Sequence, residues 1–291
     1  MLLEEAASCY PVIRIGEVEI LQQKKYGELE YLCFPQLAKT GIADHLFTTR
    51  MGGVSTGIFS SLNLSYTRGD EAGAVDENFR RVAAIFDETP DRIVCSHQTH
   101  TTNVRLVTEE DAGKGVTRER EFTDVDGLIT DTPGLLLATF YADCVPLFFV
   151  DVRHKAIGLS HSGWRGTVER MGEKTLLAMK NAFGTRPEDV YAAIGPSICA
   201  DCYEIGFDVA EPFLKEFPEQ KGIVLPGKRE GKYQLDLWKA NETVLLDAGI
   251  LKEHLEITDI CTCHNPDYLF SHRASHGKRG NLAAFMELRK S

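Results

Sequence analysis

Residues 134–166 read GLLLATFYADCVPLFFVDVRHKAIGLSHSGWRG and contain three apolar runs separated by short polar breaks. Each run has the length of a β-strand and is apolar on both faces, which is typical of strands that are covered on two sides. Three similar runs precede it, with the sequences RIVCSH, NVRLVT and DGLIT. We therefore predict a mixed α/β sandwich, in which a mixed β-sheet is flanked by helices or by a second sheet.

The segments on either side complete this organisation. Alternation of apolar and polar residues on both sides of Gly27 predicts a β-hairpin over residues 17–34. A segment rich in Gly, Ser and Thr, from 45 to 65, predicts a loop that closely approaches a ligand or another part of the backbone. No repeat or linker divides the chain, so we predict one domain over 1–291, with an N-terminal hairpin within 12–35 and a catalytic core over about 45–288.

Four segments show the periodicity or the end signals of helices. Asp76 is predicted to cap a helix that continues to about Phe86, because apolar residues follow it at helical spacing. The last of the four begins at the cap residue Asp236 and ends before Gly249. This last helix is predicted over 236–248, and the second and third are predicted over 167–183 and 207–217.

The composition indicates a folded protein and argues against a general nucleic-acid binder, while a small anionic substrate stays possible. Hydrophobic residues make up 43% of the chain and charged residues 26%, and the formal net charge is -11. An acidic chain is a poor nonspecific ligand for nucleic acid, which needs clustered Lys and Arg. The first eleven residues, MLLEEAASCYP, lack the features of a secretory signal, and no apolar run is long enough to span a membrane. We therefore predict a cytoplasmic location, where the eight cysteines stay reduced.

Three strand ends carry side chains that can bind a metal or act as a nucleophile. The sequences are SHQTH, YADCVP and SHSGWRG, and the residues concerned are His100, Cys144 and His161. Reactive groups of α/β folds usually lie where strands open into loops, so these three residues are expected to converge. Two imidazoles and a thiolate suit Zn²⁺ and leave a fourth position for water or substrate. The alternative is a buried structural cysteine and two histidines satisfied within loops.

An anion site is indicated immediately after His161. The sequence GWRGTV places Arg165 in a glycine-bounded turn that leads into a helix, whose first N–H groups favour phosphate. In the alternative interpretation, Gly163 and Gly166 are ordinary turn residues and Arg165 forms a structural salt bridge.

Five linked motifs resemble one known family over residues from about Phe47 to Leu288. This is the bacterial YfiH type, first described as laccase-domain polyphenol oxidases and now as zinc-dependent purine nucleoside phosphorylases. The resemblance implies an α/β sandwich related to a toxin class with a Cys and His pair, and zinc ligands at His100, Cys144 and His161. The motifs are DVDGLIT, YADCVPL, HSGWRGT, AIGPSIC with CYEIG, and LFSHR.

The resemblance also implies the reaction. It is phosphorolysis of adenosine, inosine and methylthioadenosine to a free purine and a pentose 1-phosphate, together with deamination of adenosine. Phosphorolysis needs an anion-binding group and stabilisation of a cationic transition state. We predict Arg165 and Arg50 as ligands of phosphate, with Asn63 and Arg273 completing the substrate site. Asp143 or Asp126 could move protons, although Asp126 also fits a turn or capping role.

Two departures from the family pattern concern the site. The chain has QTHT at 98–101 where QVHG is common, which leaves His100 in place. It has SHRAS and RGN, at 271–275 and 279–281, where SxRRD and TGR are common. The second departure removes an Arg-Asp pair at Ala274 and Ser275 and places Asn281 where an arginine is common, so contacts from this region to the substrate differ here.

Three other functions are compatible with the sequence. Cys144 as a nucleophile with His161 as its base would make a hydrolase or amidase, including an editing enzyme for peptidoglycan precursors. A copper-dependent polyphenol oxidase is disfavoured, because the nine histidines form no paired HxH elements. A structural zinc module is the third, and its candidate ligands are Cys199, Cys202, Cys261, Cys263 and His264.

Overall fold

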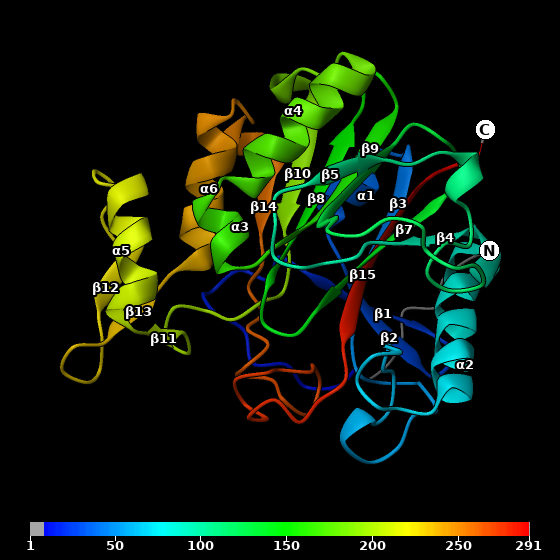
Figure 1. Cartoon of the computed structure of the whole chain (residues 1–291), viewed down its shortest axis with the longest axis horizontal. Coiled ribbons are helices and arrows are strands. Elements are labelled where there is room, and N and C mark those ends of the chain that lie inside the picture. Colours follow the sequence, from blue (N-terminus) through cyan, green and yellow to red (C-terminus); the bar gives the residue numbers. More distant parts are fainter. Residues whose placement is uncertain (1–8, 291) are drawn as a thin grey trace.

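Two six-stranded sheets face each other across the centre of the structure (Figure 1). The computed structural model describes residues 9–290. The first sheet has the order β1-β2-β3-β15-β7-β4. Its strands are β1 (Gln22–Tyr26), β2 (Leu29–Cys33), β3 (Ala43–Thr48), β15 (Leu282–Leu288), β7 (Leu136–Tyr141) and β4 (Ile93–Cys95).

The second sheet has the order β14-β10-β8-β9-β6-β5. Its central strands come from the apolar runs of the middle of the chain, and β8 and β9 pair antiparallel. Both sheets are mixed, because β4–β7, β5–β6 and β10–β14 are parallel pairs in otherwise antiparallel surroundings. The strands are β14 (Leu255–Ile257), β10 (Val190–Ile194), β8 (Val145–Asp151), β9 (Ala156–Ser162), β6 (Gly127–Thr130) and β5 (Val104–Leu106).

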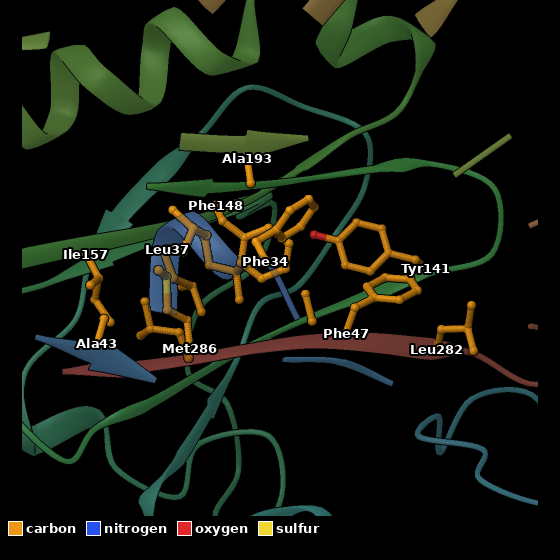
Figure 2. Close-up of a cluster of buried hydrophobic side chains, with 14 of the residues drawn as sticks. Phe34, Leu37, Ala43, Phe47, Tyr141, Phe148, Ile157, Ala193, Leu282 and Met286 are labelled. Carbon is orange, nitrogen blue, oxygen red and sulfur yellow. The ribbon is translucent and has the colours of Figure 1, made fainter. Parts of the chain in front are cut away.

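The main core lies between the two sheets and consists of aromatic and aliphatic side chains. Figure 2 shows Phe47 and Met286 of the first sheet facing Phe148 and Ala193 of the second, with Phe34 between them. All five side chains are at most 1% exposed. Burial of this apolar surface from both sheets, at about 25 cal/mol per Å², is the main force that holds the sheets together.

Helices cover the outer faces of both sheets. α2 (Ala72–Ala83) packs on the first sheet, whereas α4 (Met171–Phe183) and α6 (Leu237–Asp247) pack on the second (Figure 1). Each sheet is therefore buried on two sides, which explains why its strands are apolar throughout. The other helices are α1 (Pro35–Lys39), α3 (Trp164–Val168) and α5 (Phe207–Glu216), and a small third sheet has the order β11-β13-β12, from β11 (Glu204–Ile205), β13 (Tyr233–Leu235) and β12 (Val224–Pro226).

Single turns of 3₁₀-helix connect many of these elements. They are η1 (Gly57–Phe59), η2 (Ala84–Phe86), η3 (Pro90–Arg92), η4 (Glu109–Asp111), η5 (Pro187–Asp189) and η6 (Lys252–His254).

The observed fold confirms the predicted mixed α/β sandwich with helices flanking mixed sheets. All six predicted apolar runs of the middle of the chain form strands, β4 to β9. The predicted hairpin is present but shorter than 17–34, with Tyr26 paired to Leu29 across a turn in which Gly27 has a positive φ. Asp236 caps helix α6 as predicted, since its side chain accepts a hydrogen bond from the backbone N–H of Lys239.

Two helix predictions were wrong in their bounds. The helix predicted to begin at Asp76 begins at Ala72, and the Asp76 carboxylate instead accepts a hydrogen bond from the Tyr66 hydroxyl. The helix predicted over 167–183 is two helices, because Arg170 takes a left-handed conformation between α3 and α4. This break lets Arg170 bond to Glu173, Glu216 and Asp247 at once.

Within residues 9–290, no helix combines the length and the apolar character that a membrane span requires. The N-terminal segment predicted to lack a secretory signal falls largely on residues 1–8, outside the described residues.

A buried carboxylate on β15 makes the stability of the fold depend on pH. Glu287 is 6% exposed, and burial together with Glu88 and Asp44 raises its pKa to about 8. Since the unfolded side chain has a pKa of about 4.3, the folded state binds the extra proton between these values and loses stability as the pH rises through them. We expect Glu287→Gln to stabilise the protein by roughly 1–3 kcal/mol at pH 8 and by much less at pH 4.5.

Thermal unfolding of both proteins across this pH range measures the difference. The exposed Glu219 provides the control, because Glu219→Gln alters no buried charge. A gain in stability that does not grow with pH would show that Glu287 is ionised in the folded protein.

Candidate functional site

The strand register brings Cys144 and His161 together. Cys144 immediately precedes β8, and His161 lies on β9 opposite Pro146, the second residue of β8. His100 comes from the segment after β4, where it takes a left-handed conformation with φ of 66°. One potential ligand atom from each of these three side chains lies within 4.8 Å of those of the other two. The structure therefore brings together the three residues that were predicted as metal ligands.

The three side chains form a site that is open on one side. His161 is buried at 3% exposure, Cys144 is half-buried, and His100 is exposed. The Cys144 Sγ lies 3.9 Å from His100 Nε2, and the two imidazole rings are 5.0 Å apart and almost perpendicular. Three protein donors leave the fourth position of a tetrahedral ion for a further ligand.

Asp126 holds two of the three residues in place. Its buried carboxylate accepts a hydrogen bond from His161 Nδ1 at 2.8 Å. It also accepts from the backbone N–H groups of Thr99, His100 and Thr101, and so shapes the loop that carries His100. Because Nδ1 of His161 is engaged, Nε2 is the nitrogen that remains for a ligand, as in many metal-binding histidines. Asp126 therefore does form the turn-stabilising hydrogen bonds considered for it, and the turn that it stabilises is the one that carries His100.

The charges of the site are strongly coupled. Burial alone would raise the pKa of the Cys144 thiol, but His161 and hydrogen bonds from both imidazoles lower it to about 6. Burial would lower the pKa of His161, but the Cys144 thiolate and Asp126 raise it to about 9. The pKa of Asp126, which burial would raise, is lowered to about 2, chiefly by His161. The site therefore favours a thiolate beside one positive charge, which a proton or a metal cation can supply.

Gly163 is required by the close approach of the backbone to these side chains. A Cβ at this position would lie 2.7 Å from His100 Cδ2 and 3.4 Å from Cys144 Sγ. Its backbone conformation, φ -70° and ψ 177°, is open to any residue, so the clash alone excludes a side chain.

His100, Cys144 and His161 are called the trio below. We expect Gly163→Ala to lower kcat/KM for phosphorolysis, the reaction that the resemblance implies, roughly tenfold, because displacement of His100 by a fraction of an ångström disturbs the trio. Gly166→Ala is the matched control within the same motif, since a Cβ there meets nothing closer than 3.5 Å. Steady-state kinetics of the two variants make the test, and equal activities would show that His100 moves without effect.

A pocket of about 960 Å³ opens in front of the trio. This volume lies at the upper end of the range of about 300–1,000 Å³ that is typical of small-molecule sites. All three members of the trio line it, with the wall completed by segments before β15, after β7 and around residues 64–68 and 115–120. Charged and polar groups in the wall include Arg68, Gln98, Arg120, Tyr141, Arg279 and Asn281.

Arg279 is the buried cation of this pocket. It is 8% exposed, and its Nε has no hydrogen-bond partner among the described residues. Its Nη1 donates to the carbonyl of Gly280 and to the Asn281 side chain. Burial and the neighbouring Arg68 lower its pKa to about 10, so the guanidinium stays charged at neutral pH. A buried cation in the wall of a pocket is suited to bind an anion there.

Sequence reasoning missed Arg279, although a signal was present. The chain carries Asn281 at the position where the resemblance implies an arginine, and it has Arg279 two residues earlier. Residues two apart in an extended segment point in the same direction, so the cation can be supplied from either position.

Gln98 was noted only within a motif in the sequence. In the structure, its side-chain amide pairs with the backbone N–H and C=O of Phe140.

The other predicted site residues have partners away from the pocket. Asp143 accepts hydrogen bonds from the Thr262 hydroxyl and from the backbone N–H of Arg273. Arg50 donates to the carbonyls of Ser60 and Pro266. None of these residues is among the described residues that line the pocket, and Asn63 and Arg165 are likewise outside that wall.

Each of these predicted substrate ligands has a clear local role. Buried Asn63 bonds to Asp70 and to the backbone N–H of Asn281. Arg165 is exposed and lies over the ring of Trp164, with its guanidinium carbon 4.3 Å from the ring centroid. Arg273 donates to the carbonyls of Cys202 and Glu204.

Comparison with known proteins identifies relatives along most of the chain. The family described as multi-copper polyphenol oxidoreductase laccase matches residues 44–289. Purine nucleoside phosphorylase YlmD of Bacillus subtilis is 34% identical over 249 residues, which are 84% of this chain and 88% of that protein. Adenosine deaminase RL5, from an unknown prokaryotic organism, is 32% identical over 84% of this chain and 94% of its own length.

A solved structure also matches the fold. The crystal structure of YlmD from Geobacillus stearothermophilus superposes with a TM-score of 0.85 at 35% identity. The match covers 94% of this chain and the whole of the other.

Proposed function

The chain belongs to the multi-copper polyphenol oxidoreductase laccase family, and from this premise we propose that it is a zinc-dependent purine nucleoside phosphorylase that also deaminates adenosine. The observation that carries the proposal is the open trio of His100, Cys144 and His161, which lines the same pocket as the buried Arg279. The names of the relatives, purine nucleoside phosphorylase and adenosine deaminase, supply the substrate class.

The donor set of the trio fits zinc. Two imidazole nitrogens and one thiolate are common ligands of catalytic zinc sites that keep one open position. The hydrogen bond from His161 Nδ1 to Asp126 is the support that metal-binding histidines usually have. When bound, zinc supplies a Lewis acid to the group in its open position. Phenol oxidation by several coppers would need further clustered histidines, and the second metal-capable group among the described residues contains three cysteines and one histidine.

Different residues bind phosphate and orient the metal ligands during phosphorolysis. Arg279 binds phosphate in the pocket, with the exposed Arg68 adding positive charge near it. A phosphate oxygen then forms a bond to C1′ of the pentose while the C1′–N9 bond breaks, and the purine leaves with the electron pair and takes up a proton. Asp126 keeps His161 and the His100 loop oriented throughout.

Deamination uses the same pocket with water in place of phosphate. Water adds to C6 of adenine, and ammonia leaves with the electron pair of the C6–N bond. The reducing, cytoplasmic location predicted from the sequence suits a site with a half-buried thiolate, and all eight cysteines are free thiols in the structure.

Phosphate dependence tests the proposal. The purified protein is incubated with inosine, with and without inorganic phosphate, and free hypoxanthine and pentose 1-phosphate are measured. We expect base release only with phosphate, equal amounts of the two products, and loss of activity after zinc chelation that zinc restores. Base release that is independent of phosphate would contradict the assignment.

Arg279 has a defined role in this scheme. We expect Arg279→Gln to raise the KM for phosphate roughly tenfold with a smaller change in the KM for inosine, because a charged hydrogen bond to the anion is lost. The exposed neighbour Lys278 offers the control variant Lys278→Gln. Kinetics at varied phosphate concentration make the measurement, and an unchanged KM for phosphate would place the anion elsewhere.

One observation favours a second candidate function. The lowered pKa of Cys144 and the raised pKa of His161 describe a thiolate and imidazolium pair, which is the arrangement of a cysteine hydrolase or amidase. Alkylation separates the two functions. A nucleophile is alkylated in the active protein with loss of activity, whereas a zinc ligand is protected until chelation.

A further inference from the structure

A second group of cysteine and histidine side chains lies outside the pocket. It contains Cys199, Cys202, Cys261 and His264, whose ligand atoms all lie within 4.8 Å of one another. Two of them, Cys199 Sγ and His264 Nδ1, are 3.9 Å apart. In the sequence the four residues form two pairs of equal spacing, Cys-x-x-Cys and Cys-x-x-His. The Cys-x-x-Cys spacing is a common half-site of structural zinc.

The group differs by one ligand from the set considered in the sequence. Cys263, two residues after Cys261, is not a member, and His264 is. The half-site in CTCH is therefore Cys261 with His264, so the unusual Cys-x-Cys spacing is not used.

The second sheet brings the two pairs together. Strands β10 and β14 are parallel neighbours, and the chain leaves both at the same edge. Beyond them, Ser197 pairs with Cys261, and Thr262 donates its backbone N–H to the carbonyl of Ser197. The backbone N–H of Cys199 donates to Cys261 Sγ at 3.3 Å, a bond that stabilises negative charge on sulfur.

We propose that Cys199, Cys202, Cys261 and His264 bind a structural zinc ion. Three thiolates and one imidazole provide a closed tetrahedral set with no position for substrate, and such sets select zinc among abundant divalent metals. With Zn–S of about 2.3 Å and Zn–N of about 2.1 Å, tetrahedral sulfur and nitrogen ligands are about 3.6 Å apart, within a few tenths of an ångström of the 3.9 Å between Cys199 Sγ and His264 Nδ1. Cys199 and Cys261 are almost fully buried, as expected for ligands of a structural ion.

Nearby cations offset the net negative charge of this set. Arg273 donates to the backbone carbonyl of the ligand Cys202, and Lys228 donates to that of Asp201 beside it. Three thiolates and Zn²⁺ leave one negative charge, which these two groups help to balance.

This zinc ion fastens the loops that support the trio. Ile198 donates its backbone N–H to the carbonyl of Asp143, and Thr262 donates its hydroxyl to the Asp143 carboxylate. Each of these residues adjoins a ligand of the group, and Asp143 adjoins Cys144. The ion also links Cys202 to Cys261, the residues on either side of the segment 203–260. This segment carries α5, the small sheet and α6 (Figure 1). Asp143 thus acts as a positioning residue that links the two sites.

Metal content tests this proposal without reference to enzyme activity. The full chain is purified under reducing conditions and loaded with Zn²⁺, and zinc is counted by elemental analysis. Cys144→Ala removes the trio as a site, and we expect it to retain one zinc ion per chain. In that background we expect Cys202→Ser to lose the ion and the neighbouring Cys263→Ser to keep it. Circular dichroism establishes that each variant is folded.

Cobalt substitution provides a measurement that requires no further variant. We expect Co²⁺-loaded Cys144→Ala protein to show thiolate-to-cobalt charge transfer, and chelation to lower its Tm by roughly 5 °C or more. A folded Cys144→Ala protein that binds no zinc and shows no such band would overturn the proposal, as would equal zinc loss in the Cys202 and Cys263 variants. If the trio binds no metal, the wild type instead shows one ion that Cys144→Ala retains, so the two sites are judged separately.

Discussion

Replacement of Cys144 by alanine is expected to lower kcat/KM for inosine phosphorolysis by roughly a thousandfold or more. The variant loses the only thiolate of the trio and therefore its charge match to zinc, since the two imidazoles that remain are neutral ligands. Support residues around metal ligands are worth about 10–100-fold, and a direct ligand is worth more. Cys144 is half-buried at a turn, so its removal leaves the core intact. Steady-state kinetics and zinc content are measured on the same sample.

The control is Cys9→Ser, at another partly buried cysteine that lies outside the pocket wall. We expect this variant to keep wild-type kinetics and metal content. A folded Cys144→Ala enzyme with activity within tenfold of the wild type would contradict a catalytic role for the trio.

Asp126→Asn is expected to lower kcat/KM by about a hundredfold and to weaken zinc binding to a similar extent. The wild-type carboxylate accepts four hydrogen bonds from the His100 loop and one from His161 Nδ1. An amide supplies one acceptor oxygen and presents N–H groups to donors, so at least one buried bond is replaced by repulsion. The effect on metal affinity follows the loss of the group that orients His161.

Asp124→Asn tests whether this effect is specific. Asp124 is an exposed carboxylate two residues away that accepts a hydrogen bond from the Thr99 hydroxyl. We expect a change of less than threefold in its kinetics. Zinc titration and thermal unfolding of both variants separate loss of metal from loss of fold, and equal effects in the two would show that Asp126 has only a general structural role.

The strands of the two sheets were predictable because burial on both faces leaves a simple pattern. Runs such as VPLFFVD have no polar residue to place against solvent, and each forms a strand as expected. The partner of each strand was not predictable. β15 joins β3 and β7 from the far end of the chain, a pairing that depends on long-range packing and leaves no local signal.

Helix bounds failed where tertiary contacts outweighed local preference. Asp76 was predicted as the start because it can cap a helix and apolar residues follow it at helical spacing, whereas Gly73 disfavours a helix by about 1 kcal/mol. Full burial of Val75 against the first sheet outweighs that cost and begins α2 at Ala72.

The part of the site that the strand register determines was predictable. The part that the loops determine was not. Cys144 and His161 adjoin paired positions of β8 and β9, so their proximity follows from the strands. The pocket wall depends on how the loops before β15 and after β3 fold over the trio, and this arrangement brings Arg279 to the pocket instead of Arg50 or Arg165. Asp126 gains its role because its carboxylate reaches a loop 25 to 27 residues earlier in the chain.

An anomalous X-ray map collected at the zinc edge tests the central claim most directly. The crystals would contain zinc-loaded wild-type protein, and data below the edge would identify the element. We expect a zinc peak at about 2.0–2.4 Å from one nitrogen each of His100 and His161 and from the Sγ of Cys144. No peak at the trio in a zinc-loaded crystal, or a peak there that Cys144 does not contact, would contradict it.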